Sequence, residues 1–310
     1  MSTVITPFQG IDSFSMATFN NRISQINTGF SYISNPNLLD NWYFGNPVNQ
    51  RGATGSITIN RYFIDRWLYA NGDSASSLNF NDGIVTLNGN NGYCALRQIF
   101  ETPKSEFIGK RITISALTTE LGLVSYTFTC LDGVENFKIF SDAGSYLDFD
   151  TRADNVLFTF VAELETISVI ACKIEFGDQQ TLAHQENGVW VLNEIPNYGE
   201  QLARCQRYYN VIKAVSVNAR YGYGTGASDN ICVFVPINVP LRAVPSISMV
   251  GNFFAWDGVT PYPATFRAFD SLSTNGVTFS ITSTDMTAGK SFQLLDAGTG
   301  NSAIILDANL

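Results

Sequence analysis

The chain has 310 residues, of which 45% are hydrophobic and only 15% are charged, and it carries a net charge of −9 at pH 7. This length suffices for two domains that each bury a core, and a charged fraction below the roughly 25% of typical soluble proteins indicates a folded chain with few surface charges. The acidic balance offers no basic surface to phosphate backbones, so the composition argues against nucleic acid as a partner.

The cysteines and the N-terminus add two further expectations. The cysteines are odd in number, far apart and never form a CxxC pair, which predicts buried small side chains in a reducing compartment rather than a disulfide framework or a zinc site. The opening MSTVITPFQG lacks the basic and apolar regions of a secretory signal, and no run of about 18 apolar residues occurs. We therefore expect no membrane insertion.

Residues 1–35 carry the apolar spacing of a helix that buries a narrow seam. Six apolar residues recur at alternating intervals of three and four positions: Met16, Phe19, Ile23, Ile26, Phe30 and Ile33. Isoleucine at both kinds of seam position favours trimeric or tetrameric coiled coils over dimers. The pattern is shorter than three to four heptads, so a single amphipathic helix lying on its own domain is the alternative.

From residue 36 to about residue 180 the pattern changes to alternation with period two, which is typical of half-buried strands. Gly, Asn, Asp or Ser bounds each apolar run. The expected strands are 56–60, 83–87, 111–115, 125–129, 136–140, 156–161 and 166–176. Short strands with regular turn signals predict an all-β, jelly-roll-like antiparallel sandwich over 36–180.

Residues 181–209 are predicted to form a linker and one short helix. Tyr198, Leu202, Cys205 and Tyr209 fall on one face at helical spacing, and Asn197 precedes them as a potential N-cap. His184 is the only histidine of the chain, so no second histidine is present for a metal pair, and a solvent-exposed or capping role is expected.

Residues 210–310 predict a second β-rich domain, a C-terminal knob. Its expected strands are 211–217, 231–235, 246–250, 265–269, 277–281, 292–295 and 303–306. Two segments rich in glycine and aromatic residues, 221–230 and 251–263, are predicted to be loops between them. The GYGTG sequence within the first loop is not followed by Lys and Ser or Thr, so it predicts a flexible turn rather than a phosphate-binding loop.

Four sequence elements, in order, resemble one known family. They are NLLDNWYFGNPVNQRG at 37–52, YFIDRW at 62–67, KIEFG at 173–177 and YGEQLARCQRYY at 198–209. This order is similar to the carbohydrate-binding-module-like β-sandwich of bacteriophage tail-fibre and virion-surface proteins. The segment 236–249 and the ILDANL ending resemble, more weakly, the terminal knobs of phage fibres.

The resemblance implies a virion protein that is assembled in the cytoplasm of the host bacterium. The N-terminal segment would form a homotrimer and bind other virion proteins, and the whole would adhere to bacterial surface glycan. Linking three copies would raise the effective concentration of weak sugar contacts. The alternative from the same resemblance is a purely structural head or tail fibre, or a decoration protein, that binds only other virion proteins.

Carbohydrate-binding sandwiches hold sugars against exposed aromatic rings, with polar side chains on the hydroxyl groups. Residue type alone offers candidates in both domains: Trp42, Tyr43, Tyr69, Tyr93 and Arg97 in the sandwich, and Tyr221, Tyr223, Phe254, Trp256 and Tyr262 in the knob. Packing at a trimer interface or over the core is the competing role for the knob aromatics. For Trp67 of the 62–67 element, which is expected to be a strand, we predict a core position whose indole N–H needs a partner, with sugar stacking as the alternative.

Enzymatic activity is not predicted. Hydrolysis of a glycan commonly needs two carboxylates across the scissile bond, and the sequence cannot pair any two of its glutamates, nor does it show a nucleophile motif or a depolymerase repeat. No cofactor is predicted either. Sandwich modules of this kind often carry calcium, and Asp73, Asp82, Asp148 or Asp150 could supply oxygens, but no loop has a specific calcium spacing, so no metal site follows.

Overall fold

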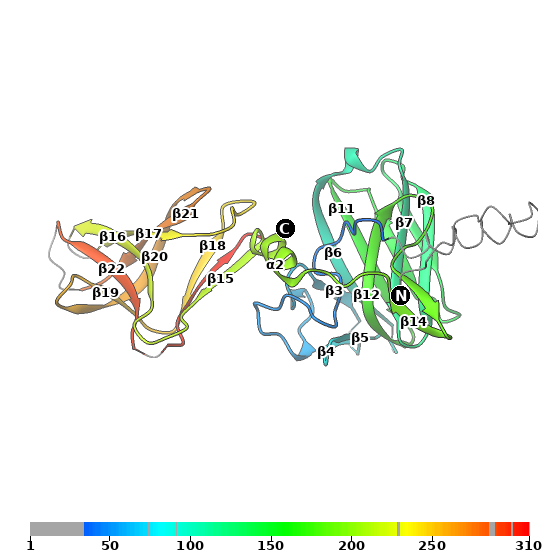
Figure 1. The fold of residues 1–310 in the computed structure, drawn as a ribbon, viewed down its shortest axis with the longest axis horizontal. Coiled ribbons are helices and arrows are strands. Elements are labelled where there is room, and N and C mark those ends of the chain that lie inside the picture. Colours follow the sequence, from blue (N-terminus) through cyan, green and yellow to red (C-terminus); the bar gives the residue numbers. More distant parts are fainter. Residues whose placement is uncertain are drawn as a thin grey trace, which may run out of the picture. The chain divides into compact units, whose positions relative to one another are not determined.

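The computed structural model describes residues 34–73, 75–90, 92–227, 230–284, 289–298 and 300–309. The predicted seam residues, Met16 to Ile33, lie outside these ranges, so the trimer stays a prediction. The chain divides into two compact units (Figure 1), one made of Met1–Pro47 and Gly52–Asn197 and the other of Val48–Arg51 and Tyr198–Leu310. The boundary at Asn197 places the short helix in the second unit, whereas the sequence suggested a separate linker.

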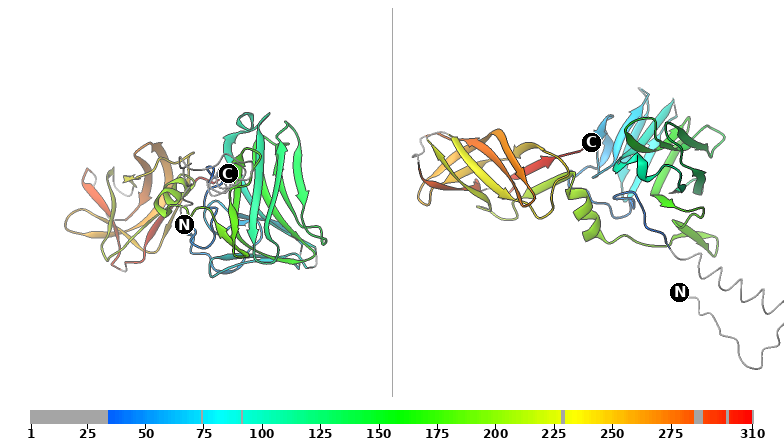
Figure 2. Two further views of the ribbon diagram at one scale, coloured as in Figure 1. Left: turned by 45° about the vertical axis from the view of Figure 1, so that its right-hand side comes forward. Right: turned by 90° about the horizontal axis from the view of Figure 1, so that it is seen from above.

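The first unit contains two six-stranded antiparallel sheets (Figures 1 and 2). The first sheet runs in the order β1 (Gly55–Ile57), β4 (Ser77–Asn81), β5 (Ile84–Asn88), β12 (Thr166–Phe176), β7 (Arg111–Thr118) and β8 (Gly122–Thr129). The second sheet runs in the order β2 (Arg61–Tyr62), β3 (Leu68–Gly72), β6 (Tyr93–Pro103), β11 (Asn155–Glu163), β10 (Tyr146–Asp150) and β9 (Glu135–Ile139). The all-β prediction is thus confirmed.

Alternation along the strands builds the core between these sheets. On β10, Leu147 and Phe149 join the apolar core, so Asp148 and Asp150 face the opposite side of the sheet. Trp67 is fully buried, its indole N–H donates to the Asn41 carbonyl at 2.8 Å, and its ring packs edge-on against Phe44. The predicted core role of Trp67 is confirmed.

Two local predictions for this unit are wrong. Residues 63–67 form a tight turn between β2 and β3 and not a strand, with Arg66 in the left-handed region at φ 73°. The buried guanidinium of Arg66 pairs with Asp40 at 3.0 Å, and this buried ion pair is the interaction that the turn makes possible. Part of the expected linker is also packed, because Leu182 and Ala183 belong to the core.

The segment after the core strand forms a hairpin of β13 (Ala183–Glu186) and β14 (Val189–Leu192). His184 lies on it half-buried, with Nδ1 at 2.5 Å from Asn193 Oδ1 and Nε2 at 3.1 Å from Glu186 Oε1. These contacts are local and polar, so the geometry assigns His184 a structural role within the hairpin.

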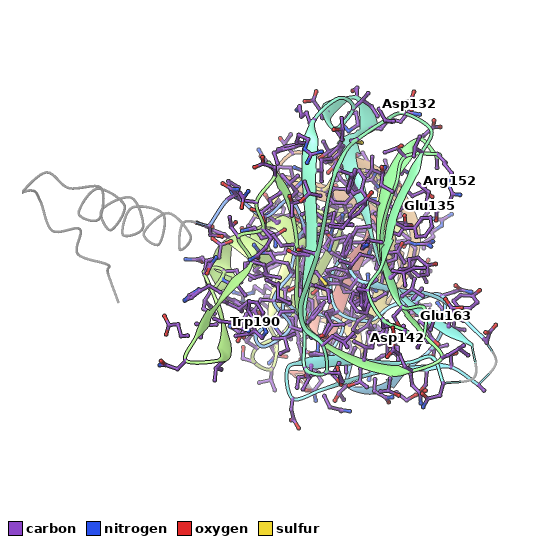
Figure 3. The ribbon with its side chains drawn as sticks, turned by 90° about the vertical axis from the view of Figure 1, so that its right-hand side faces the viewer. Asp132, Glu135, Asp142, Arg152, Glu163 and Trp190 are labelled. Carbon is purple, nitrogen blue, oxygen red and sulfur yellow. The ribbon has the colours of Figure 1, made fainter. Side chains whose placement is uncertain are left out.

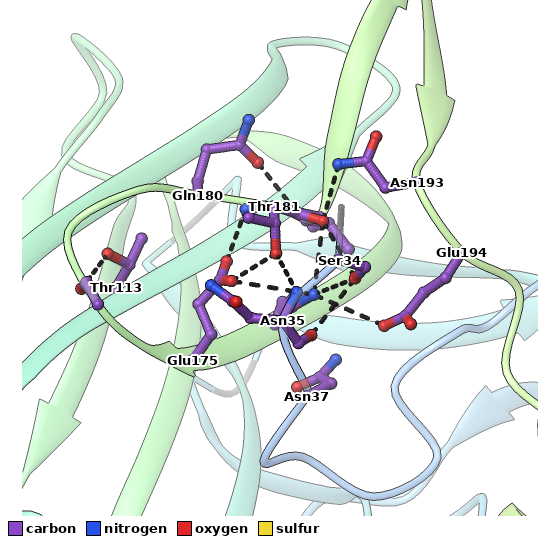
Figure 4. Close-up of polar contacts among 12 residues, drawn as sticks. Ser34, Asn35, Asn37, Thr113, Glu175, Gln180, Thr181, Asn193 and Glu194 are labelled. Atoms are coloured by element: carbon purple, nitrogen blue, oxygen red, sulfur yellow. Dashed lines mark hydrogen bonds and ion pairs between the residues drawn. The ribbon is translucent and has the colours of Figure 1, made fainter. Parts of the chain in front are cut away.

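A buried polar cluster surrounds the KIEFG strand (Figure 4). Lys173 is inaccessible to solvent; its ammonium donates to the Ser34 hydroxyl at 2.5 Å and lies 3.5 Å from a carboxylate oxygen of Glu194. Glu175, also fully buried, accepts a hydrogen bond from the Thr181 backbone N–H at 2.7 Å. Burial lowers the pKa of Lys173, and the two glutamates oppose that shift. The KIEFG element thus fastens residues 34–35 and 180–194 to β12.

The second unit contains a closed six-stranded barrel and a three-stranded sheet (Figure 1). The barrel follows the order β16 (Arg220–Ala227), β17 (Asn230–Pro236), β21 (Gly276–Thr282), β20 (Pro261–Ser273), β19 (Phe253–Trp256) and β22 (Ser291–Asp296). The sheet consists of β15 (Tyr209–Lys213), β23 (Ala303–Asp307) and β18 (Ser246–Val250), preceded by the helix α2 (Tyr198–Gln206).

The NQRG element contributes to this second unit. Gln50 Nε2 donates to the Tyr209 carbonyl at 2.6 Å, and the Arg51 guanidinium lies 3.6 Å from the centre of the Tyr209 ring. Arg51 also lies 3.7 Å from Asp307 of β23. The NQRG and QRYY sequences, which lie far apart in the chain, therefore meet at one strand end.

Both segments that were predicted as loops contain barrel strands, which corrects that prediction. In β16 glycine alternates with larger residues, and Gly222 and Gly224 face the same side as the core residues Leu294 and Phe292 of β22. A Cβ atom on Gly224 would overlap the Cys232 carbonyl of β17. Glycine is required here by close strand approach, not by turn flexibility.

The cysteine prediction holds for four residues and fails for one. Cys94, Cys130, Cys172 and Cys205 are buried and form no disulfide, but Cys232 is exposed on β17. Its position on the strand explains the difference, because the neighbours Ile231 and Val233 point into the barrel and so turn Cys232 outward.

Candidate functional site

The outer face of the barrel gathers aromatic side chains at β19. Phe253 and Ala255 point into the barrel core, so the alternate residues Phe254 and Trp256 point outward. Both outward rings are partly exposed. The four-residue strand β19 thus places one aromatic side chain in the core and two at the surface.

Strand pairing places further residues beside these two rings. Gln293 of β22 lies opposite Trp256 on one side and opposite Tyr223 of β16 on the other. Leu295 is likewise placed between Phe254 and Arg220. We call the resulting surface the aromatic face, and it consists of Arg220, Tyr223, Phe254, Trp256, Pro261, Gln293 and Leu295.

Two hollows adjoin at Trp256, which lines both of them. One, of about 340 Å³, is lined by Asn218, Arg220, Phe254, Trp256, Pro261 and Leu295. The other, of about 280 Å³, is lined by Tyr223, Trp256, Asp257, Gly258, Ser291, Phe292 and Gln293. Each combines aromatic rings with a few polar side chains, the composition of sites for small ligands.

Polar groups surround the rings of the aromatic face. The Arg220 guanidinium lies 5.9 Å from the centre of the Trp256 ring, within range of a cation–π contact. Asp257 accepts hydrogen bonds from the backbone N–H groups of Thr260 at 2.7 Å and Val259 at 3.0 Å, and pairs with Lys290 at 2.6 Å. Hydrogen bonding to Lys290 holds the pKa of Asp257 well below its usual range.

Gln293 supplies a hydrogen-bond acceptor in the middle of this face. Its Oε1 atom is buried and has no hydrogen-bond partner among the residues that the structure describes. It sits in the register position between Tyr223 and Trp256. The aromatic face can therefore offer flat apolar surface and a cation to one ligand, and the unsatisfied Gln293 Oε1 lies beneath this surface.

The other two knob candidates lie inside the barrel. Tyr221 is buried, with its hydroxyl donating to the Ser302 carbonyl at 2.6 Å. Tyr262 lies opposite the core residue Ala255 and packs edge-on against Phe292 at 6.4 Å. Neither belongs to the aromatic face, because the register shift between Arg220 and Gly222 on β16 turns Tyr221 into the core and the pairing of Tyr262 with Ala255 places Tyr262 on the core side of β20.

In the sandwich, burial removes two candidates from the set. Trp42 and Tyr69 are each only 2% exposed and pack in the core, so neither ring has a face open to a sugar. Tyr43 is partly buried, and its ring covers Gly45. Tyr93 and Arg97 lie partly exposed on the outer side of the second sheet, where Arg97 Nε donates to Thr159 Oγ1 at 3.2 Å.

Three carboxylates gather on that outer side, as Figure 3 shows for Glu135. Glu135, Asp148 and Asp150 each place an oxygen within 4.8 Å of the others. Arg152 binds both oxygens of Asp150, at 3.0 and 2.8 Å, and one oxygen of Glu135 at 2.7 Å. Of the four aspartates considered for calcium in the sequence, only Asp148 and Asp150 belong to this cluster.

The pKa values of the two aspartates in this cluster are shifted in opposite directions. Burial, together with the charges of Glu135 and Asp150, raises the pKa of Asp148 to about 7. Burial would raise the pKa of Asp150 as well, but hydrogen bonds from Arg152 outweigh it and hold that pKa below its usual range. The outer side of the second sheet therefore holds a carboxylate pair with opposite pKa shifts.

Comparison with known proteins adds no name to these sites. No protein-family model and no curated protein matches the sequence. Within the described ranges, none of the helices has the length and apolar content needed to cross a membrane.

Proposed function

We propose that the chain is a virion-surface fibre protein of a bacteriophage and that it adheres to bacterial surface glycan through the aromatic face of its barrel. The observation that carries this proposal is the convergence of Tyr223, Phe254 and Trp256 on two hollows that share the Trp256 ring. The four ordered sequence elements of the phage sandwich family support the virion part of the proposal.

The chemistry of the aromatic face suits a sugar. Pyranose rings present an apolar face of C–H groups that packs on an indole or phenol ring, while their hydroxyl groups need hydrogen-bond partners. Trp256 offers the ring, Arg220 a donor, and the Gln293 side chain lines the adjoining hollow. Exposed aromatic side chains clustered in this way mark a contact surface more often than a passive one.

Homotrimer formation through the N-terminal seam completes the proposal. Three copies would present three aromatic faces, so modest affinity at each face would suffice for firm adhesion. The N-terminal segment would also attach the trimer to other virion proteins. The same protein would be synthesised in the host cytoplasm before it joins the particle.

The proposal is tested by binding of the purified chain to an array of bacterial surface polysaccharides. We expect wild type to bind at least one glycan and Trp256→Ala to bind it at least about tenfold more weakly, as for a central aromatic contact. Phe137→Ala is the matched comparison, because Phe137 is 52% exposed and lies on the sandwich. Light scattering and circular dichroism check that each variant keeps its oligomeric state and fold.

The outcomes separate the alternatives. Loss in Trp256→Ala with full binding in Phe137→Ala supports the barrel as the adhesive unit. The reverse pattern places adhesion on the sandwich and contradicts the aromatic face as the site. Absence of binding by wild type to every glycan contradicts adhesion and favours a purely structural fibre.

A further inference from the structure

The outer side of the second sheet brings together three carboxylates from two neighbouring strands. Asp148 and Asp150 alternate on β10 and face away from the core, and Glu135 lies opposite Asp150 on β9. One oxygen from each residue lies within 4.8 Å of the other two. The strands fix these positions, because β9, β10 and β11 are paired throughout the segment.

A second observation concerns the hydrogen bonding of Asp148. The residue is only 6% exposed, and its Oδ1 atom is inaccessible and has no hydrogen-bond partner within the described residues. Burying a carboxylate without a partner is unfavourable, because the lost hydration is not replaced. The fold therefore holds in this cluster a buried carboxylate with one oxygen that no protein donor satisfies.

The neighbouring arginines do not supply that donor. Arg152 is bound to Asp150 and Glu135, and no hydrogen bond joins it to Asp148. Arg97 donates its Nε hydrogen to Thr159 instead. The Arg152 side chain is 55% exposed, so it can move outward while the backbone of β10 keeps the aspartates in place. Figure 3 shows Arg152 and Glu135 side by side at this surface.

We propose that Glu135, Asp148 and Asp150 bind a divalent cation of the calcium type. Oxygens within 4.8 Å of one another need only a small inward movement of the side chains to lie at about 2.3–2.6 Å from a shared Ca²⁺ ion, and Ca²⁺ accepts the irregular geometry that three strand side chains impose. Water completes the coordination shell. The cation satisfies Asp148 and relieves the repulsion among the three carboxylates, and Arg152 shifts toward solvent to admit it.

The test uses the full chain, stripped of metal with a chelator and titrated with Tb³⁺ and then with Ca²⁺ up to about 10⁻³ M, the range in which extracellular modules bind. Tyr146 lies two positions before Asp148 on the same side of β10, so it should sensitise Tb³⁺ luminescence. Wild type should show luminescence that Ca²⁺ reverses. Asp148→Asn should weaken binding of both ions at least about tenfold, the scale expected for loss of one charged ligand.

Two further variants keep the test specific. Asp142→Asn makes the same charge change at an exposed residue outside the cluster and should bind as wild type does (Figure 3). Tyr146→Phe should reduce the luminescence without changing the affinity for Ca²⁺, which locates the ion beside Tyr146. Thermal unfolding in chelator verifies that Asp148→Asn is folded.

Equal affinity in Asp148→Asn and Asp142→Asn would overturn the proposal. So would the absence of Ca²⁺ binding by wild type, including the case in which binding appears only after Arg152→Gln, because Arg152 would then be the resident cation. Weakening confined to Asp148→Asn, with luminescence dependent on Tyr146, supports it.

Discussion

Trp42 and Trp67 of the sandwich and Trp256 of the barrel are placed in opposite ways. In the sandwich, Trp42, Trp67 and Tyr69 are at most 2% exposed and pack between the sheets. In the barrel, Trp256 and Phe254 point outward while small or apolar neighbours fill the interior. The same residue types thus stabilise one unit and form a candidate binding surface on the other, and the register relative to the core decides which.

Asp148 of the sandwich and Asp257 of the barrel also differ, in their hydrogen bonding and in the direction of their pKa shifts. Asp148 of the sandwich is buried without a hydrogen-bond donor to its Oδ1, and burial raises its pKa to about 7. Asp257 of the barrel is bound by Lys290 and by two backbone N–H groups, and its pKa lies below the usual range. The first carboxylate destabilises the fold that contains it, whereas the second stabilises its turn.

The largest expected effect is on stability, where replacing the buried Trp67 and the outward-pointing Trp256 by alanine should give different losses. Trp67→Ala should lower the free energy of unfolding of the sandwich by about 3–5 kcal/mol, because it leaves a large cavity and removes the partner of the Asn41 carbonyl. Trp256→Ala should change the stability of the barrel by no more than about 1 kcal/mol. Urea unfolding, with a separate transition fitted for each unit, measures both. Similar losses would show that Trp256 is a core residue and would remove the contrast.

Next in size is the pH dependence of Asp148→Asn in the presence of a chelator. Between the unfolded pKa of 3.8 and the folded value of about 7, the folded chain retains a proton that the unfolded chain releases. The free energy of unfolding of wild type therefore falls as pH rises from about 4 to about 7. Asparagine does not ionise. The free energy of unfolding of the variant should therefore rise relative to that of wild type over this pH range, by on the order of a few kcal/mol.

In the barrel, Asp257→Asn should change the dependence of stability on pH in the opposite direction. The folded pKa of Asp257 is depressed, so its stabilisation is present above the unfolded value of 3.8 and is lost as pH falls through the folded pKa. The variant should thus be less stable than wild type at neutral pH and approach it in acid. Unfolding at several pH values measures both variants, and parallel curves for Asp148→Asn and wild type would contradict the account of the sandwich.

A smaller effect is expected where β16 approaches β17. Gly224→Ala should destabilise the barrel by about 1–3 kcal/mol, because the added methyl group meets the Cys232 carbonyl. Thr225→Ala is the control, since Thr225 is exposed on the outer side of the same strand. Thermal unfolding of both variants tests this, and equal stability would mean that the alternating glycines are not needed for closure.

Strands with regular alternation were predictable from the sequence. The predictions for 166–176 and 246–250 coincide with β12 and β18. By contrast, β16 and β19 resembled loops, because glycine and aromatic clusters are typical of turns and contact loops. The segment of β10 was not predicted as a strand, since aspartate is depleted in strands and two of its three outward positions are aspartate.

The candidate sites were predictable only in part. Tyr223, Phe254 and Trp256 were candidates by residue type, but nothing in the sequence indicated that Gln293 lies between two of them. That neighbour arises from the pairing of β22 with both β16 and β19, which are far apart in the chain. Glu135 meets Asp150 for the same reason, through the register of β9 with β10. Local alternation could have given the direction of each side chain but not its partners.

The most direct test of the account uses the indole N–H signals of the four tryptophans, assigned with single Trp→Phe variants and recorded while a bound glycan is titrated. The account predicts that the Trp256 signal shifts with saturation, while the signals of the buried Trp42 and Trp67 stay in place. A glycan that binds and leaves the Trp256 signal unmoved would contradict the assignment of adhesion to the aromatic face.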